Sequence, residues 1–403
     1  MADVDVFRRE LVAFLEHELP EKLGELPPIT AEYWGGRKPD GYHPQSAAYC
    51  ELMAERGLTA PTWPKEYGGG GLDKAEAKVL QEELRRLRLP APLVGFGLAM
   101  IGPTLLQFGT EEQKREHLPN IVRGKIRWVQ GYSEPGAGSD LAAVQTSARF
   151  EGDELILNGQ KVWTSHGDKG DWMFALVRTD AHVKKQEGIT FLLLDMDQPG
   201  VEVRLIKLIS GASPFCETFF SDARAHKKDI IYGLGKGWTV AKALLGHERN
   251  MIGDVFGTGQ AERGRKNQKN PLGELAREYL GELPNGQVAD AVLRDRVAQI
   301  SMDERCFALT MQRSADNLKA GHRPGAESSI FKVYGTELNQ RRHELMLSIR
   351  GPQALGWEES AGFDLNELTQ TRDWLRSRGN TIEGGTSEVQ LNIIAKHVLD
   401  LPD

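Results

Sequence analysis

The 403-residue sequence is poor in cysteine and has no excess of positive charge, and both features exclude classes of protein. Its three cysteines, Cys50, Cys216 and Cys306, lie far apart and match no metal-binding or redox spacing. An odd, scattered set is typical of a reducing compartment, so we expect no metal site and buried, inert thiols. A net charge of -7 argues against general nucleic-acid binding, which requires a basic surface.

Long apolar runs are also absent, so no segment is expected to cross a membrane. Residues 1–20 have a helical rather than a signal-peptide pattern, and they carry acidic residues from the start, unlike a transit peptide. We therefore expect a cytoplasmic enzyme. The chain is too long for one simple core, and two or three domains are the reasonable expectation.

Three kinds of periodicity follow one another along the chain. Helical patterns ended by Gly or Pro dominate residues 1–125, while residues 126–235 contain short alternating segments and an Asn-Gly pair at Asn158 that predicts a hairpin turn. Four helical segments follow in residues 236–403. We predict a mainly α protein with a central β-domain: an N-terminal α-helical domain (1–125), a middle β-barrel domain (126–235) and a C-terminal four-helix bundle domain (236–403).

Two stretches of the predicted β-domain contain residue types suited to a flat cofactor. In "GYSEPGAGSD", Gly136 and Gly138 would let the backbone approach a phosphate or a ring, although a simple β-turn explains such glycines equally well. In "NGQKVWTSHG", Trp163 could lay its face on a planar cofactor while Ser165 donates a hydrogen bond. Taken alone, core packing of the tryptophan is the simpler interpretation.

Glu248 is a carboxylate in the middle of an apolar helix stripe. It lies four residues after Leu244 and four before Ile252 in "KALLGHERNMIG". Burial of a carboxylate there would raise its pKa, as a proton-abstracting base requires. A structural ion pair with an arginine such as Arg249 is an equally good explanation, and at this point both remain open.

The C-terminal stretch "TIEGGTSEVQ" combines an acid, two glycines and a predicted helix start. Ser387 and Gln390 have capping-box spacing, which predicts that the last helix begins at Ser387 or one residue earlier. Gly384 and Gly385 then present bare backbone N–H groups ahead of a helix N-terminus, a geometry that suits an anion or a polarised carbonyl. An ordinary glycine-rich loop before an N-cap is the alternative.

Taken together, "YSEPGAGSDLAAVQTSARFEGDELILNGQKVWTSHG" and "TIEGGTSEVQLNIIAKHVLDLP" closely resemble the acyl-CoA dehydrogenase family of flavoproteins. The likeness covers nearly the whole chain, including the loop "WPKEYGGGGL". It implies an FAD-dependent oxidoreductase that introduces an α,β double bond into an acyl-CoA thioester, as in fatty acid β-oxidation. It also implies that electron-transferring flavoprotein takes the electrons and that the protein is a homo-oligomer, usually a tetramer and sometimes a dimer.

The resemblance assigns roles to the residues that match the family's motifs. Positions implied to bind FAD are Gln130, Tyr132, Ser133, Ser139, Trp163, Ser165, Thr386 and Glu388. Ser139 and Arg249 are further implied to bind the CoA part of the substrate, and Ser165 to bond near flavin N5.

The family places its catalytic base in one of two positions. The C-terminal position falls on Gly384 here, whereas Glu383 is one residue too early, and a one-residue shift in an extended segment turns a side chain to the opposite side. The other position, on the first bundle helix, is Glu248. We therefore predict Glu248 as the base and the backbone N–H of Gly384 as the group that polarises the thioester oxygen.

Two departures from the family pattern concern the adenine end of FAD. The segment "RGRKNQKNPLGELAREYL" lacks the usual Arg-x-x-Phe-Gly, and "GPQALG" from Gly351 replaces Gly-Gly-x-Gly. An acyl-CoA oxidase on the same fold, or one subunit of a heteromeric acyl-CoA dehydrogenase, are therefore alternatives. Members with the base on the bundle helix often accept long, branched or bulky acyl groups, which favours such a substrate here.

Overall fold

A computed structural model describes residues 2–38, 40–245, 271–321, 325, 328–358 and 362–402. The predicted base Glu248 and its neighbour Arg249 lie outside these residues. The chain divides into two compact units, Met1–Ile206 with Pro214–His247 and Lys207–Ser213 with Glu248–Asp403. In the described part of the chain, no helix is both long enough and apolar enough to cross a membrane.

The first unit begins with helices whose apolar side chains pack into two separate cores. The helices are α1 (Ala2–Ala13), α2 (Leu19–Leu23), α3 (Ser46–Glu55), α4 (Lys74–Arg86), α5 (Gly102–Phe108) and α6 (Glu111–Val122). Leu11, Phe14 and Leu15, spaced three and four residues apart, are buried against residues of α3 and α4. Capping boxes fix the starts of α4, at Asp73, and of α6, at Thr110.

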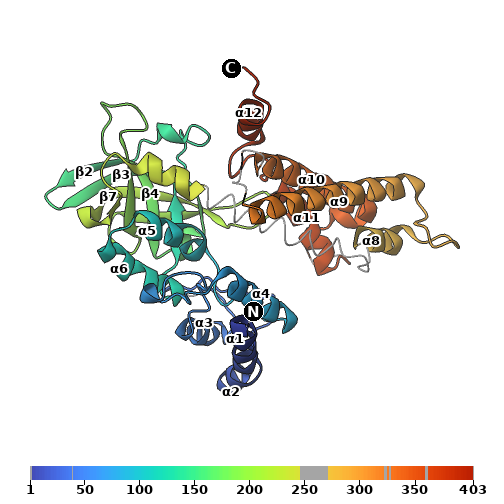
Figure 1. Ribbon diagram of the computed structural model, residues 1–403. Helices are drawn as coiled ribbons and strands as arrows, with labels where there is room; N and C mark the ends of the chain where they lie inside the picture. The colour runs from blue at the N-terminus through green and yellow to red at the C-terminus, as the bar shows by residue number, and fades with distance from the viewer. Residues whose placement is uncertain are drawn as a thin grey trace. The chain divides into compact units, whose positions relative to one another are not determined.

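The central β-domain is one eight-stranded sheet. Its strands are β1 (Trp128–Gly131), β2 (Ser147–Glu151), β3 (Glu154–Ser165), β4 (Trp172–Arg178), β5 (Ile189–Asp195), β6 (Val201–Ile206), β7 (Phe215–His226) and β8 (Ile230–Ile231). The order is β6-β7-β3-β2-β4-β5-β8, with β1 parallel to β4. Both faces of β4 are buried, because Phe174 and Leu176 join the core shared with α5 and α6, while Met173 and Ala175 join a second core. Figure 1 shows α5 and α6 beside the strands.

The prediction of a hairpin turn at Asn158 is wrong. Strand β3 continues through Asn158 and Gly159, and the turn joining β2 to β3 lies at Gly152 and Asp153 instead. The Asn158 side chain donates to Asp222 Oδ1 at 2.9 Å and accepts from the Asp222 backbone N–H at 3.0 Å. Asp222 is an extra residue of β7, with φ 54, and forms a β-bulge. The Asn158 side chain therefore forms hydrogen bonds with a bulge residue and is not part of a turn.

The second unit is helical: α8 (Pro271–Leu280), α9 (Ala291–Lys319), α10 (Ser328–Arg350), α11 (Leu365–Ser377) and α12 (Ser387–His397). The predicted second, third and last helices are present as α9, α10 and α12, and the first lies partly outside the described residues. Helices α8 and α11 were not among the four predicted. The predicted fold class, mainly α with a central β-domain, is confirmed.

Of the three thiols, Cys50 and Cys216 are buried as predicted, but Cys306 is exposed on α9. The expectation of three buried thiols is therefore wrong at Cys306. Scattered cysteines say nothing about which face of a helix they occupy, and only the packing of α9 determines that exposure.

Candidate active site

A buried ion pair holds the loop "YSEPGAGSD" against the sheet. Lys161 on β3 is fully buried, and its ammonium donates to Glu134 at 2.7 Å, to the Leu176 carbonyl at 2.6 Å and to the Tyr132 carbonyl at 3.2 Å. Glu134 in turn accepts from two backbone N–H groups, those of residues 145 and 146, at 2.6 and 2.9 Å. The pair therefore connects the loop to three separate segments of the β-domain.

The two charges of this pair shift each other's pKa. Burial lowers the pKa of Lys161 to about 8, against the opposing effect of Glu134. Burial of Glu134 acts to raise its pKa, but the Lys161 ammonium and the backbone donors outweigh it, so the pKa lies below the usual value. Sequence reasoning missed this pair, although Lys161 lies in phase with the buried Leu155 and Leu157 on β3.

Trp163 is presented to solvent by a β-bulge. Between the pairs Lys161–Thr218 and Thr164–Cys216, β3 contains one more residue than β7. Trp163 takes up this extra length with φ 62, a left-handed conformation that is unfavourable for a bulky residue. The residue is 55% exposed, and its ring lies edge-on to Phe215 at a centroid distance of 6.1 Å. Core packing does not account for this tryptophan, and strained, exposed residues of this kind cluster at functional sites.

The loop and the bulge adjoin each other. The N–H of Val162 donates to the Ser133 carbonyl at 2.9 Å, which places the start of the loop beside Trp163. Ser165, half-buried, closes β3 opposite Phe215. The sequence-predicted cofactor positions in this unit thus come from two elements, β1 with its loop and the end of β3.

The remaining predicted positions in this unit differ in exposure. Gln130 on β1 is half-buried, and Tyr132 is buried with its ring edge against Phe174 and Phe191 at 6.0 and 6.3 Å. Ser139 is exposed. A Cβ atom added at the neighbouring Gly136 or Gly138 would meet no atom of the chain within 4 Å, so these glycines leave an open backbone surface rather than relieve internal crowding.

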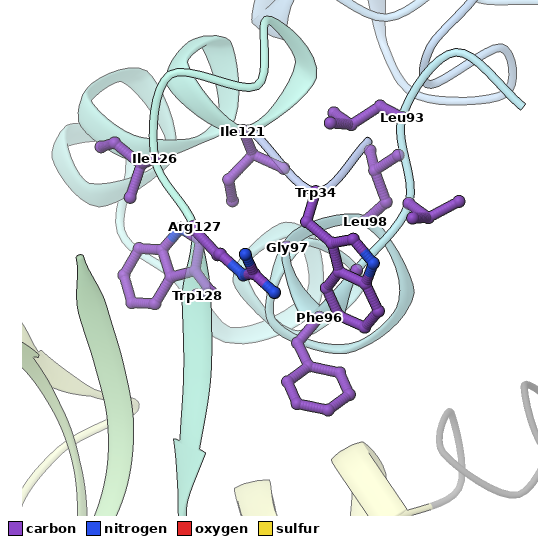
Figure 2. Close-up of a pocket in the computed structure, with 11 residues that line it drawn as sticks. Trp34, Leu93, Phe96, Gly97, Leu98, Ile121, Ile126, Arg127 and Trp128 are labelled. Atoms are coloured by element: carbon purple, nitrogen blue, oxygen red, sulfur yellow. The ribbon is translucent and has the colours of Figure 1, made fainter. Parts of the chain in front are cut away.

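An aromatic cluster that sequence reasoning did not identify lies beside Ser165. Trp34 lies 5.0 Å from the His166 ring and 5.8 Å from Phe96, and the Arg127 guanidinium lies 5.0 Å above it. Figure 2 shows Trp34, Phe96 and Arg127 around a cavity of about 10 Å³, room for about one water. Burial lowers the pKa of His166. In the sequence, the pair Gly35-Gly36 after Trp34 could have indicated a close backbone contact in this region. In the structure, a Cβ atom at Gly35 would lie 2.3 Å from the Gly124 carbonyl oxygen, so only glycine fits there.

In the second unit, the C-terminal loop ends in a well-capped helix. The N-cap of α12 is Thr386, whose Oγ1 accepts from the Val389 N–H at 3.2 Å, so the helix begins at Ser387 as predicted. The predicted capping box of Ser387 and Gln390 is wrong, because Thr386 takes the capping position. Gly384 and Gly385 precede it with φ 60 and 91. In the described part of the chain, no backbone hydrogen bond uses the N–H of Gly384, which leaves it available to a ligand.

Glu383 and Glu388 have different surroundings. Both carboxylate oxygens of Glu383 are engaged, by Arg376 at 2.7 Å and by Asn380 Nδ2 at 2.6 Å. Glu388 is exposed, and bonds from its own N–H and from Thr386, with the charge of Lys332, lower its pKa. Glu383 is thus held by two side chains of the C-terminal region, whereas the pKa of Glu388 is lowered by groups at the start of α12.

Models of one protein family match three successive segments of the chain. Residues 5–125 match the N-terminal domain of acyl-CoA dehydrogenases, residues 130–223 the middle domain and residues 235–399 the C-terminal domain. The chain is 35% identical to an acyl-CoA dehydrogenase of Mycobacterium tuberculosis, IpdE1, over 100% of its own length and 99% of that protein.

Solved structures give the same result. The chain superposes on the ChsE4-ChsE5 complex from Mycobacterium tuberculosis with a TM-score of 0.72 and 28% identity, covering 100% of this chain and 98% of that one. A structure described as the Tcur3481-Tcur3483 steroid ACAD gives the same TM-score, with 26% identity and the same coverage. Sequence, domain order and fold agree, and the chain belongs to the acyl-CoA dehydrogenase family of FAD-dependent oxidoreductases.

Proposed function

We propose that the protein oxidises an acyl-CoA thioester to the trans-2-enoyl-CoA and passes the electrons to electron-transferring flavoprotein. The observation that supports this most strongly is Trp163, an exposed indole held in a left-handed conformation beside an open glycine loop. The chain maintains this strain at a position where the ring packs on little of its own structure. A flat ligand such as the flavin fits a site of that kind.

The residues of this chain would divide the chemistry among them. FAD, when bound, supplies the acceptor for the hydride that leaves the substrate β-carbon. Glu248 removes the α-proton, and the N–H of Gly384 holds the thioester oxygen as negative charge develops on it. Ser139 and Arg249 bind the CoA part. The proposed cofactor positions are Trp163 and, in addition, Gln130, Tyr132, Ser133, Ser165, Thr386 and Glu388.

The environment of Glu383 supports Glu248 as the base. Both oxygens of the Glu383 carboxylate are already engaged, by Arg376 and Asn380, so these contacts would have to break before it could approach a substrate. Glu248 is in the family's alternative position, and the sequence pattern predicts it on an apolar helix stripe. Neither argument requires the three-dimensional position of Glu248.

We further propose a bulky acyl group as the substrate and an oligomer as the working form. Similarity to a steroid acyl-CoA dehydrogenase structure supports the first. The candidate oligomers are a homotetramer, a homodimer and a heteromer. One similar solved structure is described as a complex of ChsE4 with ChsE5, which favours testing the heteromer. The absent Arg-x-x-Phe-Gly string points the same way, since a partner subunit could supply it.

A panel of acyl-CoAs tests the reaction and the electron acceptor together. The purified protein is expected to carry FAD, and steroid or branched acyl-CoAs should bleach the flavin faster than straight-chain ones. Reoxidation by electron-transferring flavoprotein should exceed reoxidation by oxygen, and the reverse would indicate an oxidase. A purified protein that lacks flavin and reacts with none of the acyl-CoAs would contradict the proposal of a dehydrogenase that works alone. The remaining interpretation would be one subunit of a heteromeric acyl-CoA dehydrogenase.

Substitutions at Trp163 should separate stability from cofactor binding. Glycine tolerates φ 62, so Trp163→Gly is expected to be about 1 kcal/mol more stable than Trp163→Ala, which keeps the strain. Both variants should bind FAD at least about tenfold more weakly than the wild type, because both lose the ring. Urea unfolding and flavin titration measure the two effects. Equal stability of the two variants would show that the left-handed conformation carries no strain.

A further inference from the structure

Two residues in left-handed backbone conformations lie on either side of the pair Thr164-Ser165. Trp163 has φ 62 and His166 has φ 54. Such conformations are unfavourable for residues that carry a Cβ atom, so they persist only where the surrounding structure holds them. The end of β3, which carries Ser165, therefore depends on contacts from other parts of the chain.

His166 is held both by its backbone and by its ring. Its N–H donates to the Pro214 carbonyl at 2.8 Å, and its carbonyl accepts from the Lys169 N–H at 3.0 Å. Its half-buried ring lies 5.0 Å from the Trp34 ring, with 52° between the two planes. The ring contact thus joins the end of β3 to a segment near the start of the chain.

The position of Trp34 is itself fixed by close contacts. A Cβ atom at Gly95 would lie 2.8 Å from Trp34 Cε3, so the indole lies directly on this glycine, whose φ is 117. The Arg127 guanidinium lies 5.0 Å from the indole, and Phe96 lies edge-on to it at 5.8 Å (Figure 2). A side chain packed in this way can hold the ring that lies against it.

The residues just after Trp34 bind the turn that joins β3 to β4, residues 166–171. The Arg37 N–H donates to Asp171 Oδ2 at 3.0 Å, and the Asp171 side chain is buried. The Lys38 ammonium donates to a backbone carbonyl of the same turn at 2.8 Å. One short segment therefore contacts the turn near its last residue, and Trp34 contacts it at its first.

We propose that Trp34 is a positioning residue, which holds the His166 ring and thereby sets the orientation of the Ser165 hydroxyl. One rigid peptide plane joins Ser165 to His166, so a change of φ at His166 moves the end of β3 relative to the turn. The inference rests on the proposed function, in which Ser165 bonds near flavin N5. It adds to that site a residue of the N-terminal helical region.

The absorbance bands of bound, oxidised FAD report on the Ser165 hydroxyl without turnover. They should shift in Ser165→Ala, which loses the hydroxyl. Trp34→Ala should shift them in the same direction although its hydroxyl remains, and Trp34→Phe, which keeps a ring on His166, should restore most of the wild-type spectrum. Leu19→Ala removes a fully buried side chain from the core of α1–α4, so it controls for a general loss of stability and should leave the bands unchanged.

A double-mutant cycle on the flavin-free chain shows whether Trp34 acts through His166. Trp34→Ala should weaken FAD binding about fivefold in the wild-type background, as expected for one misplaced hydrogen bond. In a His166→Gly background the same substitution should weaken binding less than about twofold, because the ring that Trp34 holds is already gone. Glycine tolerates φ 54, so the turn itself remains accessible to that variant.

Additive losses in the cycle would overturn the positioning role. So would unchanged bands in Ser165→Ala or in Trp34→Ala, or the same band shift in Leu19→Ala as in Trp34→Ala. A wild-type chain that binds FAD and gives the expected spectra and cycle, but oxidises no acyl-CoA, would contradict the proposed function and leave the role of Trp34 intact.

Discussion

Glu248→Gln is expected to slow flavin reduction by the acyl-CoA substrate at least about 100-fold, while Glu383→Gln stays within about threefold of the wild type. The first substitution removes the group that takes the α-proton. The second removes one charge from a partly exposed ion pair with Arg376, whose side chains are 33% and 42% exposed. Anaerobic stopped-flow absorbance at the flavin band measures both rates.

The glutamine variants keep the shape of each side chain, so FAD content should be unchanged in both and must be confirmed before the rates are compared. Substrate affinity should also be retained, because neither substitution alters the proposed contacts of the thioester with the Gly384 N–H or of the CoA part with Ser139 and Arg249. A Glu248→Gln protein that reduces its flavin at a near wild-type rate would refute the assignment. A large loss in Glu383→Gln alone would move the base to the C-terminal loop.

Lys161→Met is expected to lower the free energy of unfolding by about 3–5 kcal/mol, because it leaves the buried Glu134 carboxylate without its counter-charge. Adding Glu134→Gln should recover part of that loss, since the amide oxygen can still accept from one backbone N–H. Both proteins should bind FAD more weakly than the wild type, because the loop that starts at Tyr132 has lost its anchor to β3. Urea unfolding and flavin titration, run on all three proteins, measure these effects.

The same pair predicts an acid dependence of stability. The pKa of Glu134 is lowered in the folded protein from its ordinary value of 4.5. Its contribution is therefore complete above about pH 4.5 and is lost as the pH falls through the folded value. Glu134→Gln should flatten this part of the stability profile.

An unfolding free energy of Lys161→Met within about 1 kcal/mol of the wild type would show that the pair is unimportant.

Local pattern was enough to predict the order of the elements and the position of the motifs. Apolar stripes such as that of Leu11 and Leu15 are set by neighbours three and four residues apart, and the helix start at Ser387 by a hydroxyl three residues before Val389. These contacts lie within one turn of a helix, so a reader of the sequence can find them. The family resemblance rested on strings of the same local kind.

Pairings between distant segments decided what the pattern could not. Asn158 reads as a turn residue, yet it satisfies Asp222, 64 positions later, in the bulge of another strand. Trp163 owes its exposure to a register shift between β3 and β7.

The sequence by itself determined the succession of helical and β segments, the family and the candidate residues, because each depends on contacts close along the chain or on recognisable strings. The pairing of Lys161 with Glu134 and of Glu383 with Arg376, in contrast, became known only from the tertiary structure. The physical reason is that the effect of a charge on stability depends on the groups around it. Those groups come from segments far apart in sequence.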